Sequence, residues 1–217
     1  MDQDFILSLS KSYVLHQSLG VARSDAPMNR EALVRRAVHA SIALAPLYYV
    51  IPLNLPVCGW HRWTLVVMFF AGIMLFEAYR LRRGMTFLGL RPHEKGQIAS
   101  FAWAAAGITA VLWLCPHDIA AAALVGMALV DPVAGEMRRA GYGRRATVPL
   151  SIAMYFCLAA SVLVLWDLRA DSIGFVLAAV AAVLAVASES VKVRYVDDDF
   201  LMSVVPAAAM NLLALTL

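Results

Sequence analysis

The chain has 217 residues, of which 62% are hydrophobic and only 15% are charged, with a formal net charge of +3. Soluble domains carry charge on about a quarter of their residues, so this composition excludes an ordinary soluble enzyme and predicts an all-α, polytopic membrane protein. No polar stretch is long enough for a second folded domain. The three cysteines are far apart and offer no zinc or disulfide framework.

The N-terminal segment, residues 1–30, is too polar for a signal peptide. We expect it to be cytoplasmic or to lie on the membrane surface as an amphipathic helix. Its apolar side would be formed by Phe5, Ile6, Leu9, Tyr13 and Leu19. Residues 31–217 are expected to form one transmembrane domain.

Seven apolar segments approach the roughly 20 residues that a helix needs to cross a bilayer. They are residues 36–56, 62–81, 97–115, 118–136, 147–166, 172–190 and 200–217. Sixteen of the eighteen Lys and Arg fall in the N-terminal segment and in the second, fourth and sixth loops. The positive-inside rule therefore predicts that the N-terminus and these loops are cytoplasmic and that the C-terminus lies outside.

The first segment begins with charged residues at helical spacing. Glu31, Arg35 and His39 are four residues apart, so they share one helical face, and Arg36 lies three residues before His39. This face offers arginines to a phosphate and a histidine as a base or orienting group. The alternative is a basic membrane anchor whose histidine is satisfied within the helix.

Charged residues also lie between the second and third segments. Glu77 and Arg80 end the second segment, and Arg91, Glu94 and Lys95 precede the third. Glu77 lies about one turn inside apolar sequence, where an acidic residue is costly and a functional candidate. The alternative is a solvated loop with local ion pairs, which are individually weak.

The fourth segment, residues 118–136, ends with Asp131-Pro132-Val133-Ala134-Gly135 after an unbroken apolar run. Ala134 and Gly135 leave room for a ligand or metal beside the carboxylate. The following loop, with Arg144 and Arg145 next to glycines, offers cations to an anionic group. The alternative is a helix end with an acid that reaches towards water.

The last loop carries the densest acidic cluster. Glu189 ends the sixth segment, and Asp197, Asp198 and Asp199 precede the seventh. Carboxylates in this number suit Mg²⁺, which binds one or two of them together with phosphate oxygens. The alternative is a solvated charge cluster.

In this order, the motifs resemble the polyprenol kinase family, which includes dolichol kinase, phytol kinase and CTP-dependent diacylglycerol kinase. The matching elements are Arg35-Arg36-Ala-Val-His39 after Glu31, Glu77 with Arg80, Arg91 with Glu94, Asp131-Pro-Val-Ala134, and Glu189 followed by Asp198-Asp199 and Pro206. The resemblance covers about residues 30–217. The loop after Asp131 lacks the Lys and Glu that the family carries there, and Asp199 stands where the family usually has Asn.

The resemblance implies an integral membrane enzyme that transfers a phosphoryl group from a nucleoside triphosphate, generally CTP, to a lipid alcohol such as a prenol, phytol or diacylglycerol. Asp131, Asp197, Asp198 and Glu189 are the expected Mg²⁺ ligands, and Asp131, Ala134 and Gly135 the expected nucleotide contacts. The expected phosphate-binding cations are Arg35, Arg36, Arg91, Lys95, Arg144 and Arg145. The general base is expected to be His39 or Glu94, with Glu31, Glu77, Arg80 and Asp199 as further site residues.

Two other functions stay open at this point. A CDP-lipid cytidylyltransferase-like enzyme would use similar Mg²⁺ and triphosphate chemistry, and a non-catalytic relative would bind or transport lipid. An ion transporter is less well supported, because the acids gather at one membrane edge rather than near the midplane. The expected partners are the lipid alcohol, the nucleotide and membrane lipids, with no nucleic acid. The sequence leaves open a homodimer, the identity of the lipid, and the choice between CTP and ATP.

Overall fold

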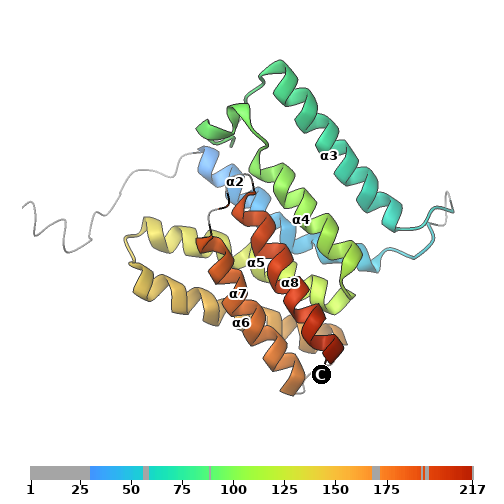
Figure 1. Cartoon of the computed structure of the whole chain (residues 1–217), viewed down its shortest axis with the longest axis vertical. Helices are drawn as coiled ribbons and strands as arrows, with labels where there is room; N and C mark the ends of the chain where they lie inside the picture. Colours follow the sequence, from blue (N-terminus) through green and yellow to red (C-terminus); the bar gives the residue numbers. More distant parts are fainter. Residues whose placement is uncertain are drawn as a thin grey trace, which may run out of the picture.

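The structure is a computed structural model of the whole chain that describes residues 30–55, 59–87, 89–167, 172–191, 193 and 196–216 (Figure 1). Within these residues the chain is helical, and the only strand-like feature is an isolated bridge between Asn54 and His61. The all-α prediction is therefore confirmed. The predicted amphipathic segment at residues 1–30 lies outside the described residues, apart from Arg30.

The helices follow the predicted apolar segments closely. They are α2 (Arg30–Ser41), η1 (Ile42–Val50), α3 (Trp63–Arg83), η2 (Pro92–Gly96), α4 (Ser100–Leu114), α5 (His117–Arg139), α6 (Arg144–Asp167), α7 (Ser172–Ser190) and α8 (Asp198–Thr216). Five of these helices, α3, α5, α6, α7 and α8, are long and apolar enough to cross a membrane. The chain is thus a membrane protein with five helices of spanning length among its described residues.

The first and third predicted segments are the two that form no long helix. In the first, the α-helix α2 gives way to the 3-10 helix η1, which contains Pro46. Proline has no N–H to donate within a helix. In the third, α4 has 15 residues, and so it rises only about 22 Å, less than the roughly 30 Å of a bilayer core. The count of seven spans and the cytoplasmic N-terminus remain predictions.

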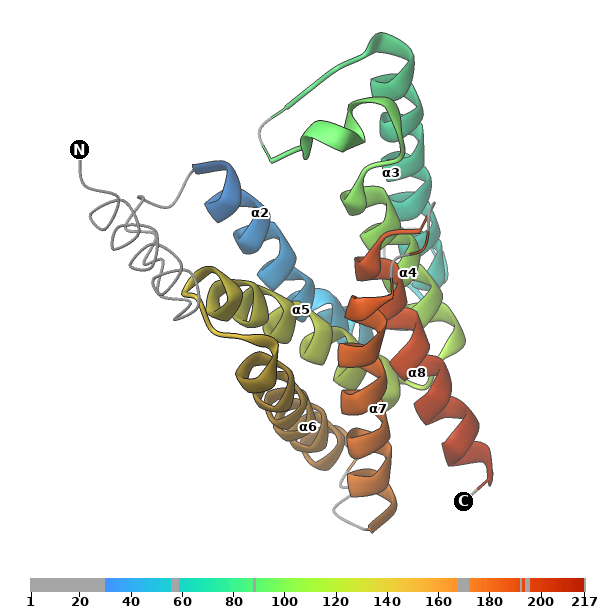
Figure 2. The same cartoon turned by 60° about the vertical axis from the view of Figure 1, so that its left-hand side comes forward.

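Helix α5 is the centre of the bundle and contacts α2, η1, α4, α6, α7 and α8. Its residues from Ile119 to Leu124 have no exposed surface, because four consecutive alanines let neighbouring backbones approach closely. The Tyr155 hydroxyl of α6 donates a hydrogen bond to the Ala123 carbonyl over 3.3 Å, and the Tyr155 ring covers Gly126. By contrast, α3 lies at the periphery beside α4 (Figures 1 and 2).

The fourth predicted segment, residues 118–136, corresponds to α5 (His117–Arg139). Helix α5 continues through Pro132 as far as Arg139. A proline inside a helix removes one backbone hydrogen bond, and neighbouring helices in a membrane bundle can compensate for this loss. Asp131 therefore lies on the side of a continuous helix, about two turns before its end, with Gly135 and Arg138 following at helical spacing.

The chain direction brings several charged helix ends together. Arg36 of α2 pairs with Glu136 near the end of α5, whereas Tyr49 of η1 lies beside His117 at the start of α5. Residues 30–50 therefore run antiparallel to α5. The start of α8 lies at the same end of the bundle as Arg36, since Asp199 approaches His39 of α2.

Candidate functional site

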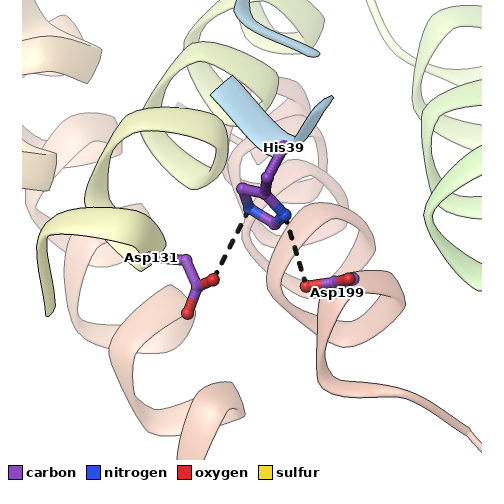
Figure 3. Close-up of side chains that lie close together, drawn as sticks. All are labelled: His39, Asp131 and Asp199. Carbon is purple, nitrogen blue, oxygen red and sulfur yellow. Dashed lines mark ion pairs between the residues drawn. The ribbon is translucent and has the colours of Figure 1, made fainter. Parts of the chain in front are cut away.

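Three helices place a histidine between two carboxylates. His39 comes from α2, Asp131 from α5 and Asp199 from the first turn of α8 (Figure 3). The His39 Nε2 atom lies 3.7 Å from Asp131 Oδ2, and the His39 Nδ1 atom lies 3.7 Å from Asp199 Oδ1. One donor atom from each residue lies within 4.8 Å of the others. This spacing leaves room for a shared ion or a bridging group between the side chains.

The cluster is shielded from water but not sealed. The side chains of His39, Asp131 and Asp199 are 11%, 29% and 12% exposed. The His39 Nε2 atom is buried and makes no hydrogen bond within the described part of the chain. A buried polar atom in this state is costly unless a further group binds it. The cluster therefore has capacity for a ligand.

The first turn of α8 adds two more carboxylates. Asp197, Asp198 and Asp199 form a second group whose donor atoms lie within 4.8 Å of one another. Asp197 Oδ1 accepts a hydrogen bond from the Asp199 backbone N–H over 3.2 Å, which caps the helix. Burial, together with the hydrogen bond and negative charge of Asp198, raises the pKa of Asp197 to about 6. Such a group binds cations in competition with protons near neutral pH.

Arg91 reaches this acidic turn from the loop before α4. Its Nη1 atom lies 3.5 Å from Asp197 Oδ2, and its side chain is 30% exposed. Burial opposes the charge on Arg91, but Asp197, Asp198 and Asp199 outweigh that effect, and the pKa of Arg91 is raised. Arg91 is thus a permanent cation beside the carboxylates.

Two buried acids hold the loop that carries Arg91. Glu94 Oε2 accepts a hydrogen bond from the Arg91 backbone N–H at 2.8 Å, and Glu94 Oε1 accepts one from Ser100 N–H at 3.1 Å. At the end of α3, Glu77 accepts a hydrogen bond from the Ala99 N–H at 2.8 Å. Both carboxylates are therefore committed to the backbone of residues 91–100.

Arg80 completes this clamp. It pairs with Glu77 through two hydrogen bonds of 2.6 and 2.7 Å, and its Nη2 atom donates a third, 2.7 Å long, to the Gln97 carbonyl. Arg80 is 0% and Glu77 1% exposed. The pair that the sequence marked as a site element thus fastens the Arg91 loop to α3. Glu94, a predicted general base, has the same holding role.

The His39 cluster opens into a cavity of about 210 Å³. Its walls consist almost entirely of charged side chains. They are Arg35, Arg36, His39, Arg91, Asp131, Pro132, Gly135, Arg138, Asp198 and Asp199. We call this space the arginine cavity. Its four guanidinium groups give it the character of an anion site, and its three carboxylates give it that of a cation site.

A second cavity, of about 290 Å³, adjoins the first. It is lined by Arg138, Arg144, Thr147, Val148, Ser151, Val186, Glu189, Ser190 and Asp198. We call it the hydroxyl cavity, after Thr147, Ser151 and Ser190. Arg138 and Asp198 line both cavities and form the boundary between them.

Ion pairs and hydrogen bonds join the helices around this boundary. Arg138 of α5 pairs with Glu189 of α7, and Arg144 Nη2 donates a 3.2 Å hydrogen bond to Ser190 Oγ. These contacts fasten α7 to both α5 and α6. Glu189 therefore faces the hydroxyl cavity and lies outside the carboxylate groups around His39 and in the α8 turn.

Most of the predicted site residues meet at this end of the bundle, but some do not. Lys95 and Arg145 are exposed and line neither the arginine cavity nor the hydroxyl cavity. Ala134 is buried within α5 and lines neither cavity. The side chain of Glu31 lies outside the described part of the molecule.

The sequence analysis missed Arg138, which takes part in both cavities. Its signal was present, because Arg138 follows Asp131 by seven residues and so lies on the same helical face two turns later. The predicted end of the fourth segment at residue 136 placed Arg138 in the following loop instead of on the helix. Thr147 and Ser151 were missed as well, since hydroxyl residues four apart are common on membrane helices.

The donor set of the arginine cavity fits a divalent cation. The carboxylate oxygens of Asp131, Asp198 and Asp199 are the type of ligand that Mg²⁺ prefers. The imidazole of His39 is a better ligand for the later transition metals than for Mn²⁺. The Nε2 atom of His39 is buried without a hydrogen-bond partner among the described residues and lies 3.7 Å from Asp131 Oδ2. Comparisons of the chain with family models, curated proteins and solved structures found no match.

Proposed function

We propose that this chain is an integral membrane kinase that transfers the terminal phosphoryl group of a nucleoside triphosphate to a lipid alcohol at the cytoplasmic membrane surface. The observation that carries the proposal is the arginine cavity. There, carboxylates from α5 and α8 lie beside guanidinium groups from α2, α5 and the loop before α4. Phosphoryl transfer depends mainly on positioning and charge stabilisation, for which such a group of residues is suited.

The arginines take the role of holding the phosphates. Arg35 is exposed at the cavity, while Arg36 and Arg91 reach it from ion pairs with Glu136 and Asp197. A bidentate guanidinium fits phosphate oxygens as well as it fits a carboxylate. An incoming phosphate can therefore share these arginines with the carboxylates that they already pair with. Three carboxylates in the same cavity would repel a triphosphate if no further cation were bound.

A divalent cation, when bound, would supply that charge and offset the negative charge of the phosphates. Asp131, Asp198 and Asp199 are the residues that would hold it. His39 lies between Asp131 and Asp199 and orients both carboxylates, a role often taken by groups next to a metal ligand. CTP is the expected donor on the resemblance to polyprenol kinases.

The proposed reaction is a transfer of the terminal phosphoryl group to the lipid hydroxyl. The oxygen of the lipid hydroxyl forms a bond to the terminal phosphorus, and the bond from that phosphorus to the bridging oxygen breaks, with its electron pair leaving on the nucleoside diphosphate. The hydroxyl proton passes to a base. The products are a lipid phosphate and a nucleoside diphosphate.

The decisive test uses the purified full chain in lipid nanodiscs with CTP or ATP labelled on the terminal phosphate. A panel of prenols, phytol and diacylglycerol serves as acceptors. We expect label to appear in a lipid phosphate and the nucleoside diphosphate to be released. Release of pyrophosphate with a cytidylated lipid would instead identify a cytidylyltransferase. Failure to transfer label by a folded protein that still binds lipid would identify a non-catalytic lipid binder.

A further inference from the structure

The two neighbouring cavities differ in chemistry. Apart from Pro132 and Gly135, the arginine cavity is lined by charged side chains and a histidine. The hydroxyl cavity combines the alcohols of Thr147, Ser151 and Ser190 with the apolar side chains of Val148 and Val186. The first suits a polyanion and its metal, whereas the second suits a molecule that is polar at one end and apolar at the other.

We infer that the hydroxyl cavity binds the alcohol end of the lipid acceptor, and that Glu189 is the carboxylate that receives the proton of its hydroxyl. This inference rests on the proposed function, because it names where the second substrate binds. It also replaces the two bases expected from the sequence. Glu94 is committed to the backbone of the Arg91 loop, and His39 lies between two carboxylates.

The position of the cavity favours a ligand that arrives from the membrane. Most of its walls come from the first turns of α6 and the last turns of α7, both of which are long apolar helices, and Arg138 and Asp198 complete it. On α6, Val148 is 37% and Leu150 is 52% exposed, so the helix presents an apolar outer surface beside the cavity. A lipid alcohol dissolved in the bilayer reaches this surface directly, whereas a nucleotide arrives from water.

The size of the cavity fits the end of a lipid. Cavities that enclose a whole drug-sized ligand measure about 300–1,000 Å³, and the hydroxyl cavity measures about 290 Å³. It has room for the hydroxyl and the first carbons of a chain. The remaining tail would lie along the exposed apolar faces of α6 and α7, where lipid already surrounds the protein. Selection would therefore act on the alcohol end.

Glu189 is placed to orient the hydroxyl. Its side chain is 16% exposed, lines the hydroxyl cavity and pairs with Arg138, which lines both cavities. A hydroxyl that donates a hydrogen bond to Glu189 lies at the boundary formed by Arg138 and Asp198, with its oxygen facing the phosphate side. During transfer the oxygen bonds to phosphorus, the diphosphate leaves with its electron pair, and the proton goes to Glu189. Protein kinases use a carboxylate in the same way.

The binding experiment needs no catalysis. The full chain in nanodiscs is irradiated with a diazirine-tagged geranylgeraniol in the absence of nucleotide, and the labelled peptides are mapped. We expect labelling within residues 144–151 and 186–190. Ser151→Phe, which fills the cavity, should reduce it several-fold, and Leu75→Phe on the exposed surface of α3, away from both cavities, should leave it unchanged. Val148→Trp is the alternative if Ser151→Phe does not fold.

The kinetic experiment tests Glu189. In Glu189→Gln we expect turnover to fall about 100-fold, as for the loss of a general base, with the KM for nucleotide unchanged. If the tagged alcohol labels the hydroxyl cavity of a wild-type chain that transfers no phosphate, the proposed kinase activity is refuted and the proposed lipid site is supported. An active kinase in which the diazirine-tagged alcohol labels other residues would overturn the inference. A Ser151→Phe variant with a raised KM for nucleotide and unchanged alcohol labelling would also overturn it, because the hydroxyl cavity would then hold the nucleoside.

Discussion

His39 has a carboxylate at each ring nitrogen, Asp131 at Nε2 and Asp199 at Nδ1, each 3.7 Å away. The three residues are separated by about 90 and 70 positions in the chain, so no local spacing reveals their contact. What the sequence did indicate is that each is polar and lies next to an apolar segment. An ionisable residue in that position is costly unless a partner or a ligand compensates for it.

The first residue to test is Asp131. We expect Asp131→Asn to lower phosphoryl transfer by about 100-fold or more, comparable to the loss of one group that stabilises a developing charge. The variant keeps the shape of the side chain and removes its charge. Turnover is measured as transfer of the labelled phosphate, and divalent-cation affinity is measured alongside.

Glu136→Gln is the comparison variant, because it removes a second carboxylate of α5 that pairs with Arg36 but does not line the arginine cavity. It should keep most of its activity. Equal losses of activity in Asp131→Asn and Glu136→Gln would mean that activity depends on the total negative charge at this end of α5 and not on Asp131 itself.

A pH dependence follows from Asp197. Its pKa is raised to about 6, so the carboxyl is protonated below that pH and available to a cation above it. Asp197 belongs to the carboxylate group of the α8 turn with Asp198 and Asp199, so divalent-cation affinity should rise as the pH increases through about 6, since the proton competes with the metal for the carboxylate. Mn²⁺ binding followed by electron paramagnetic resonance measures this profile. Asp197→Asn should flatten it, and an unchanged profile in that variant would contradict the assignment.

At the scale of elements, a buried acid–base clamp decides where Arg91 lies. Glu77 and Arg80 of α3 hold Ala99 and Gln97, and Glu94 holds the backbone of Arg91. The sequence predicted these residues to be part of the catalytic site. Which of their atoms bind backbone groups depends on the path of residues 84–99, and that path is set by the packing of α3 against α4.

Removal of one clamp partner should be costly. In Arg80→Met the carboxylate of Glu77 stays buried without its cation, and loss of one partner of a buried ion pair typically destabilises by about 3–5 kcal/mol. The free energy of unfolding is measured by denaturant titration in detergent. The double variant Glu77→Leu/Arg80→Met should regain much of the loss, because no uncompensated charge remains. A double variant as unstable as the single one would show that the pair acts mainly through the hydrogen bonds to Ala99 and Gln97.

The packing of α5 against α6 gives another prediction. A Cβ atom at Gly126 would lie 2.7 Å from the Tyr155 ring, whereas one at Gly72 of α3 would meet nothing within 4 Å. Gly126→Ala should therefore destabilise the protein by about 1–3 kcal/mol, the usual cost of overpacking, and Gly72→Ala should not. Thermal unfolding of both variants measures the difference. The prediction fails if Gly126→Ala is as stable as the wild type.

At the scale of the whole molecule, the two ends of the bundle differ. One end carries the charged cavities, formed by the second half of α2, the first turns of α6 and α8, and the last turns of α5 and α7. The other end carries an aromatic group in which Tyr49 packs against both His117 and Trp166, with Arg62 over the Tyr49 ring. Such aromatic groups are typical of membrane–water interfaces.

This asymmetry leads to a prediction of topology. If the charged end faces the cytoplasm, as the distribution of Lys and Arg predicts, then α8 carries the C-terminus to the opposite side. Alkaline phosphatase fused after Leu217 should be active and a fluorescent protein fused there should be dark. Fusions truncated after Gly141, between α5 and α6, should give the reverse result. Activity of both phosphatase fusions would reject the predicted orientation.

The sequence by itself determined the fold class, the approximate position of each helix and the end of the bundle at which charge collects. These properties depend on local composition, since a long apolar run forms a helix in a bilayer and a basic loop marks one side of the membrane. For the same reason it identified Asp131, His39 and the acidic turn before α8 as candidates.

Which of the predicted site residues lie close together depends on the tertiary structure. It separated Lys95 and Arg145 from the cavities, committed Glu94 to a loop backbone, carried α5 through Pro132 and thereby placed Arg138 between two cavities. The physical reason is that cavities and hydrogen-bond partners arise from contacts between helices distant in sequence. Those contacts depend on packing at small residues such as Gly126, which no single segment specifies.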